Sequence, residues 1–142
     1  MLTSIPELKG KCLSLNCSMK ITFIHHIVLI VKNIAETEKY YTGFLGQPAI
    51  QNEGMLIYTI GETKVFFVLP KGEYEVKDKD KGGLNHIAFG VHSLDELKHF
   101  EGLLTQASIR HSGIKTGKQG GTEYIWMDDP DNIRIEIYYS PS

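Results

Sequence analysis

The chain has 142 residues, which is enough for one ordinary domain and too few for two large ones. A net charge of −2, spread over mixed signs, gives no electrostatic field that would attract nucleic acid or an anionic membrane. No apolar run approaches the length of a membrane-spanning helix, so we expect neither nucleic acid nor membrane among its partners.

The N-terminal 18 residues contain both cysteines, Cys12 and Cys17. Two cysteines cannot make a disulfide framework, and without neighbouring histidines they make no zinc cage, so a cytoplasmic location is expected. Residues 1–18 have no continuous apolar core and make a poor signal peptide. We interpret them as an N-terminal extension, either a packed short helix or a loose tail, ahead of a single domain at 19–142.

The first module of that domain is predicted at residues 20–70. A run rich in β-branched residues at 21–31 predicts a strand, and Asn33 predicts the start of the helix that follows. Three more strands are predicted after the helix, the first of them short: 49–52, 55–60 and 64–69. The order of elements is therefore βαβββ.

The second module is predicted at residues 84–140, after a linker at 71–83 whose alternating charges indicate a solvated segment. It begins with a strand at 85–91, and Ser93-Leu94-Asp95-Glu96 is a capping box that predicts a helix start. The remaining strands are predicted at 109–114, 124–128 and 133–139, with a strong turn signal at 129–132. The order is again βαβββ.

An internal repeat relates the two modules. The stretch 84–100 matches the stretch 24–40 at a shift of sixty positions, and His86 falls on His26. Modules of about 60 residues bury little apolar surface alone, so we expect the two to share a sheet or to pair with a partner.

The last predicted strand places a carboxylate among apolar residues. Side chains alternate across a strand, so Glu136 faces away from the isoleucines at 133, 135 and 137. A carboxylate there is costly to bury without a cation. With His26 and His86 it would form two imidazoles and one carboxylate, a ligand set for Fe(II), Mn(II), Ni(II) or Zn(II). The alternative is that each histidine is a hydrogen-bonded core residue.

Aromatic residues near Glu136 are candidates for a substrate pocket. Trp126 shares its parity if the hairpin is regular, and it is either a core residue or a wall of the pocket. Tyr124 and Tyr138 are weaker candidates of the same kind.

The loop at 111–121 contains four glycines together with Lys115 and Lys118. It is either a lid over an anionic substrate or simply a flexible loop.

These motifs resemble the vicinal oxygen chelate superfamily, which includes glyoxalase I, type I extradiol dioxygenases, fosfomycin-resistance enzymes and bleomycin-binding proteins. The matching stretches are HHIVLIVKNIAETEKYY, NHIAFGVHSLDELKHF and DDPDNIRIEIYY. The resemblance implies an α+β fold in which two tandem βαβββ modules form a curved mixed sheet around a metal-binding cup. It implies one divalent metal ion on His26, His86 and Glu136, and it makes a homodimer the expected assembly.

The sequence departs from particular members of that superfamily. Members with four protein ligands carry a second carboxylate on the fourth strand, where Phe66 aligns here, so Phe66 is expected to line the substrate pocket instead. This departure weakens the resemblance to glyoxalase I. Extradiol dioxygenases place a tyrosine where Trp126 stands, and the phosphonate-binding groups of the fosfomycin-resistance enzymes are not found.

The resemblance implies a metal-dependent lyase, transferase or dioxygenase that acts on a small oxygen-chelating substrate. The alternative is a non-catalytic protein that sequesters a drug or metabolite, as bleomycin-binding proteins do. No general base is identified, although Tyr138, Glu123 and Asp128 are candidates.

Overall fold

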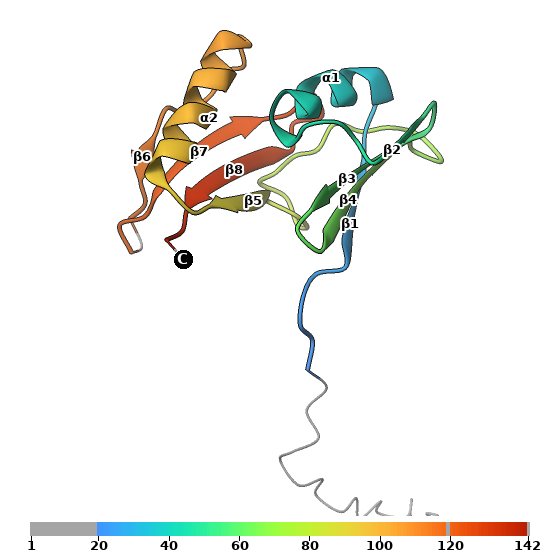
Figure 1. The fold of residues 1–142 in the computed structure, drawn as a ribbon. Helices are drawn as coiled ribbons and strands as arrows, with labels where there is room; N and C mark the ends of the chain where they lie inside the picture. The colour runs from blue at the N-terminus through green and yellow to red at the C-terminus, as the bar shows by residue number, and fades with distance from the viewer. Residues whose placement is uncertain (1–19, 119, 142) are drawn as a thin grey trace, which may run out of the picture.

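The computed structural model describes residues 20–118 and 120–141 (Figure 1). The N-terminal extension with Cys12 and Cys17 lies outside the described residues. Both interpretations of that extension therefore stay open.

The described elements follow the order βαβββ twice. The first module contains β1 (His26–Ile30), α1 (Ile34–Leu45), β2 (Ile50–Asn52), β3 (Met55–Ile60) and β4 (Thr63–Val68). The second contains β5 (His86–Val91), α2 (Leu94–Gln106), β6 (Lys115–Thr116), β7 (Glu123–Asp128) and β8 (Arg134–Tyr139). The paired βαβββ fold is confirmed.

The strands form two mixed sheets, one in each module, rather than one shared sheet. Their orders are β1-β4-β3-β2 and β5-β8-β7-β6. In each sheet the first strand of the module runs parallel to the last, and the other pairs are antiparallel. The sheets correspond strand for strand, as expected of a duplicated module.

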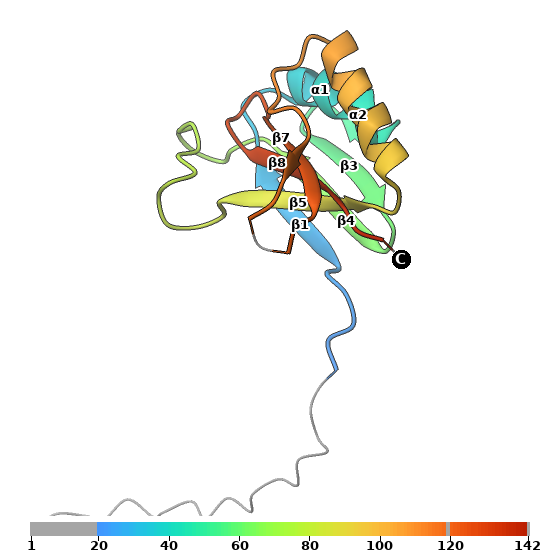
Figure 2. The ribbon, with the colours of Figure 1, turned by 90° about the vertical axis from the view of Figure 1, so that its left-hand side faces the viewer.

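Both helices lie on the same side of the two sheets (Figures 1 and 2). They meet where the rings of Phe44 and Phe100 contact each other, with centroids 5.2 Å apart. Buried residues of both modules form one continuous core under the helices, so the modules share a core although they do not share a sheet. Within the described residues, neither helix is long and apolar enough to cross a membrane.

The helix starts agree with the sequence prediction. Ser93 Oγ accepts a hydrogen bond from the Glu96 backbone N–H at 3.1 Å, and Glu96 Oε2 accepts one from the Ser93 N–H at 2.9 Å, which completes the capping box. In α1, Asn33 Oδ1 accepts from the Glu36 N–H at 3.1 Å. Each cap satisfies a backbone donor that the helix itself cannot satisfy.

The turn between β7 and β8 joins the two modules through buried carboxylates. Asp129 Oδ2 accepts a hydrogen bond from the Tyr41 hydroxyl of α1 at 2.8 Å. Asp131 Oδ1 accepts from the backbone N–H of Lys32 at 2.7 Å and also from the Tyr74 hydroxyl. Most of the linker at 71–83 is exposed, as predicted, and Tyr74 is the residue through which it contacts this turn.

Two of the predicted strands differ from those in the structure. The strand predicted at 21–31 begins only at His26, because β4 pairs with His26–Ile30 and Ile21 is left 88% exposed beyond the sheet. The strand predicted at 109–114 is a loop, and β6 follows it. Ser108 and Gly113 have φ values of 57° and 69°, which interrupt an extended chain.

Candidate metal centre

His86 and Glu136 come together on the open face of the second sheet. Their strands β5 and β8 are parallel neighbours in which Ala88 is level with Glu136, so His86 lies one step back along the strand on the same face. His86 Nε2 lies 3.7 Å from Glu136 Oε2. The Glu136 side chain is only 11% exposed, whereas the His86 side chain is 41% exposed.

The hydrogen bonds of Asn85 indicate which His86 nitrogen carries the proton. Asn85 Nδ2 donates to the Lys79 carbonyl at 2.8 Å, which turns Asn85 Oδ1 toward His86 Nδ1 at 2.8 Å. An amide oxygen can only accept, so Nδ1 of His86 is the donor. The neutral ring then has a lone pair on Nε2, the atom that faces Glu136.

When the ring is neutral, His86 Nε2 and Glu136 Oε2 are two acceptor atoms that face each other, an arrangement in which one cation can bind both. Two ligand atoms bonded at about 2.1 Å to one ion at a tetrahedral angle would lie about 3.4 Å apart. The observed 3.7 Å between His86 Nε2 and Glu136 Oε2 is within a few tenths of an ångström of that separation. These two residues therefore fit a divalent metal ion.

His26 does not join this pair within one chain. It lies on β1, and no residue of β1 has its Cα within 8 Å of a Cα of β5 or β8. Its nearest partners are His25, at 2.8 Å between the Nδ1 atoms, and the ring of Phe66, at 5.5 Å between centroids. Across residues 20–118 and 120–141, no group of three His, Cys, Asp or Glu side chains is arranged to hold a metal ion.

Phe66 occupies the position in the first module that Glu136 occupies in the second. It is level with Val28 on β1 and Ile57 on β3, as Glu136 is level with Ala88 on β5 and Trp126 on β7. The first module thus offers one imidazole beside an aromatic ring, and the second offers an imidazole beside a carboxylate.

The three aromatic residues predicted near Glu136 lie on its face. Trp126 is its direct neighbour across β7 and β8, and it is half-buried rather than part of the core. The rings of Tyr124 and Tyr138 stack with centroids 4.9 Å apart and planes 9° apart. Burial, followed by the charge of Glu136, raises the pKa of the Tyr138 phenol, so this hydroxyl stays protonated at neutral pH.

Arg134 belongs to this face as well, as strand alternation predicts, although its contacts were not predicted from the sequence. Its guanidinium lies 3.9 Å from the centroid of the Trp126 ring, and its Nε donates to Asp128 Oδ1 at 3.0 Å. Lys79 Nζ contacts the other oxygen of Asp128 at 2.9 Å. The available signal was the hairpin itself, because Asp128 and Arg134 end β7 and begin β8 and are paired across the two strands.

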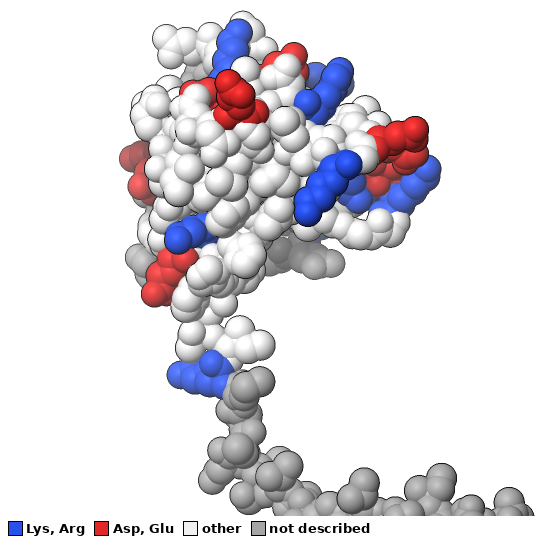
Figure 3. Space-filling view, turned by 90° about the vertical axis from the view of Figure 1, so that its right-hand side faces the viewer, with Lys and Arg blue, Asp and Glu red and all other residues white. Residues whose placement is uncertain are grey.

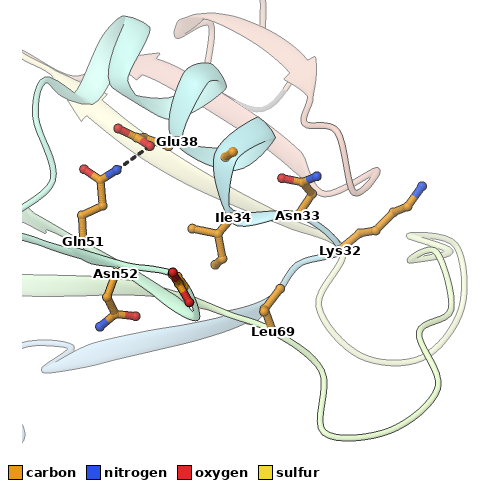
Figure 4. Close-up of a pocket in the computed structure, with 9 residues that line it drawn as sticks. Lys32, Asn33, Ile34, Glu38, Gln51, Asn52 and Leu69 are labelled. Carbon is orange, nitrogen blue, oxygen red and sulfur yellow. Dashed lines mark hydrogen bonds between the residues drawn. The ribbon is translucent and has the colours of Figure 1, made fainter.

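A pocket of about 710 Å³ lies away from this face, between the start of α1 and the β2–β3 hairpin (Figure 4). Gln51 Nε2 donates to Glu38 Oε2 at 2.6 Å across it. No histidine lines it, and its two carboxylates, Glu38 and Glu53, are not matched by an imidazole. We therefore assign the candidate site to the sheet face.

Comparison with known structures shows the class of fold. A glyoxalase family protein from Enterococcus faecalis has a TM-score of 0.70 at 20% identity, covering 84% of this chain and 99% of that one. Lactoylglutathione lyase from Agrobacterium tumefaciens has a TM-score of 0.68 at 12% identity, covering 86% and 96%. At these identities the likeness shows a glyoxalase-like fold and nothing finer.

Sequence comparison gives the family. The model of the Glyoxalase/Bleomycin resistance protein/Dioxygenase superfamily matches residues 23–137. The uncharacterized protein YwkD of Bacillus subtilis (strain 168) is 26% identical over 129 residues, covering 84% of this chain and 98% of that protein. The chain therefore belongs to the glyoxalase/bleomycin resistance protein/dioxygenase superfamily. The resemblance of its sequence motifs is confirmed.

Proposed function

We propose that this protein is a divalent-metal-dependent enzyme that acts on a small substrate with two chelating oxygens. One observation carries the proposal: the Nε2 lone pair of His86 and the carboxylate of Glu136 face each other at 3.7 Å on an open sheet face. Fe, Mn, Ni and Zn all accept this type of ligand.

The ion would act as a Lewis acid on a substrate bound through two oxygens, stabilising the negative charge that develops during the reaction. Trp126, Tyr124 and Tyr138 flank the two ligands on the same face and provide walls for such a substrate. Tyr138, whose phenol stays protonated, is suited to donate a hydrogen bond to an anionic oxygen. The reaction type, whether lyase, transferase or dioxygenase, is left open by these residues.

We further propose that a homodimer completes the ligand set, with the partner subunit's His26 joining His86 and Glu136. In one chain the face of β1 is uncovered: Val28 and Ile30 are 51% and 55% exposed. On the side of the molecule where the first module lies, the middle of the surface is a broad area without charged residues (Figure 3). Exposed apolar side chains on β1, the strand that also carries His26, favour pairing with a second copy.

The alternative is a binding protein that uses the aromatic face to sequester a drug or metabolite without chemistry. The stacked tyrosines and the Trp126 ring would suit a flat apolar ligand. The two functions differ in their need for a metal ion.

The test is the metal content of the full-length protein after incubation with Fe(II), Mn(II), Ni(II) or Zn(II) and desalting. We expect about one ion per chain for at least one metal, and a loss of at least tenfold in affinity in His86→Ala and Glu136→Gln. Asn85→Ala, which removes the hydrogen bond that orients His86, should weaken metal binding by about tenfold to a hundredfold.

The matched control is His99→Ala, because His99 is an exposed histidine on α2 and should leave metal binding intact. Retention of no metal by the wild-type protein with any of the four ions would reject the enzyme and favour the binding protein. Equal metal content in wild type and His86→Ala would move the site elsewhere.

A further inference from the structure

A pocket of about 480 Å³ opens on the side of the second sheet that carries Glu136. It lies between β6, the loop after it and the adjoining ends of β7 and β8. Its lining residues are Lys115, Thr116, Gly117, Lys118, Tyr124 and Tyr138. The stacked tyrosines belong to the face already described, so the pocket lies on the same side of the sheet as the candidate metal centre.

The charged residues that line this pocket are all cationic. Lys115 and Lys118 are its charged lining residues, and no carboxylate lines it. Among the ion pairs of the described residues, none involves either lysine. Glu123 is adjacent in sequence, but strand alternation puts it on the opposite face from Tyr124.

The strand register gives the distance from the pocket to the metal ligands. Tyr138 is two residues beyond Glu136, which is about 7 Å along the strand. Lys115 is level with Tyr124, which is level with Tyr138, so its Cα is about 10 Å from that of Tyr138 across the sheet. A small molecule with a chelating end and an anionic end can therefore span both sites.

The other cation on this face is already engaged. The Arg134 guanidinium is bound by Asp128 and stacked on Trp126. Lys115 Nζ lies 5.8 Å from the centroid of the same Trp126 ring, so it projects over the sheet face while lacking a carboxylate partner. An anion from solution would therefore be attracted to the lysines rather than to Arg134.

We propose that this pocket is the anion-binding subsite of the substrate, where Lys115 and Lys118 hold a carboxylate or phosphate group. The chelating oxygens of the same molecule would then reach the metal centre. The position of the anion relative to the substrate rests on the proposed function, whereas anion binding itself requires no metal.

The first experiment therefore uses the metal-free, full-length protein. Inorganic phosphate and acetate are titrated separately while backbone amide resonances are followed by NMR. We expect the largest shifts at Thr116, Gly117 and Tyr138, and about fivefold weaker binding in a Lys115→Met/Lys118→Met variant. The tighter of the two anions identifies the chemical class.

The control is Lys39→Met/Lys98→Met, which changes the net charge equally on the exposed surfaces of α1 and α2. It should bind both anions as the wild type does. Equal weakening in the two double variants, or shifts spread evenly over surface lysines, would overturn the subsite.

The second experiment compares two metal chelators on the metal-loaded protein by calorimetry: acetohydroxamate and glutaric monohydroxamate, which adds a carboxylate tail. We expect the tail to tighten binding about fivefold, and this gain to disappear in Lys115→Met/Lys118→Met. If acetohydroxamate binds but the tail adds nothing, the pocket is not a substrate subsite and the metal centre stands. If neither chelator binds while the anions still do, the proposed enzyme function fails and the anion site stands.

Discussion

Asp129 is a buried carboxyl at the junction of the modules. It accepts hydrogen bonds from the Tyr41 hydroxyl and from the backbone N–H groups of Asp131 and Ile133. Burial raises the pKa of Asp129 to about 6 in spite of these bonds. In the neighbouring Asp128, burial also raises the pKa, but the hydrogen bonds from Arg134 and Lys79 outweigh it and lower the pKa overall.

The raised pKa of Asp129 predicts a dependence of stability on pH. The folded protein holds this proton more tightly than the unfolded chain, whose ordinary value is 3.8. The contribution to stability is therefore fully present below about pH 4 and is lost as the pH rises through about 6. A shift of about two pKa units corresponds to up to about 3 kcal/mol.

Asp129→Asn removes this titration. Urea unfolding at intervals from pH 4 to pH 7 should show the variant gaining stability relative to wild type as the pH rises, by up to about 3 kcal/mol. Asp128→Asn serves as a control, because the pKa of Asp128 is lowered from 3.8 and its titration lies below the range measured, so its stability difference from wild type should stay constant between pH 4 and pH 7. Parallel curves for wild type and Asp129→Asn would show that the folded carboxyl titrates normally.

At the scale of elements, α2 is a helix whose starting point is set by neighbouring residues in the sequence. The helix packs on β5, β7 and β8, and its first turn is closed by the reciprocal hydrogen bonds of Ser93 and Glu96. Its start is therefore set by four consecutive residues, which is why the sequence predicted it. β6 shows the opposite case, since its position depends on pairing with β7 and on the turns at Ser108 and Gly113.

Ser93→Ala tests the capping box. Loss of the side-chain acceptor should lower the free energy of unfolding by about 1 kcal/mol, as measured by urea denaturation. Ser93→Gly should cost only about a few tenths of a kcal/mol, because glycine is tolerated at this position. An alanine variant as stable as wild type would mean that water replaces the cap without loss.

At the scale of the whole molecule, His26 lies apart from the other two proposed metal ligands. Its equivalence to His86 in the repeat predicted one shared site, yet β1 and β5 do not contact each other within the chain. A dimer in which the first module of one subunit meets the second module of its partner would reconcile the repeat with this arrangement.

Subunit mixing tests that dimer. His26→Ala and His86→Ala homodimers should each bind no metal tightly, whereas unfolding and refolding them together should restore about a quarter of the wild-type metal content. The fraction follows because about half of the dimers are then mixed, and each mixed dimer has one intact site of two. No recovery, with dimers verified by sedimentation, would place all the ligands within one chain.

The parts of this protein that were predictable from sequence are those with local causes. The two βαβββ modules, the caps at Asn33 and Ser93 and the open face of Glu136 follow from periodicity and short motifs, and the structure agrees with each. The equivalence of Phe66 and Glu136 also followed from aligning the two copies of the repeat, and the strand pairings agree with it.

Other features depend on contacts between segments far apart in the chain. Sequence alone could not reveal that Asp129 and Asp131 are buried by α1 and the linker, or that Asn85 orients His86 through the Lys79 carbonyl. Nor could it separate His26 from the other ligands. The repeat determined that both modules carry a histidine at the same strand position, because duplication preserves local sequence. The packing of the modules decided that one chain brings only His86 and Glu136 together, because a shared core under the helices leaves β1 and β5 apart.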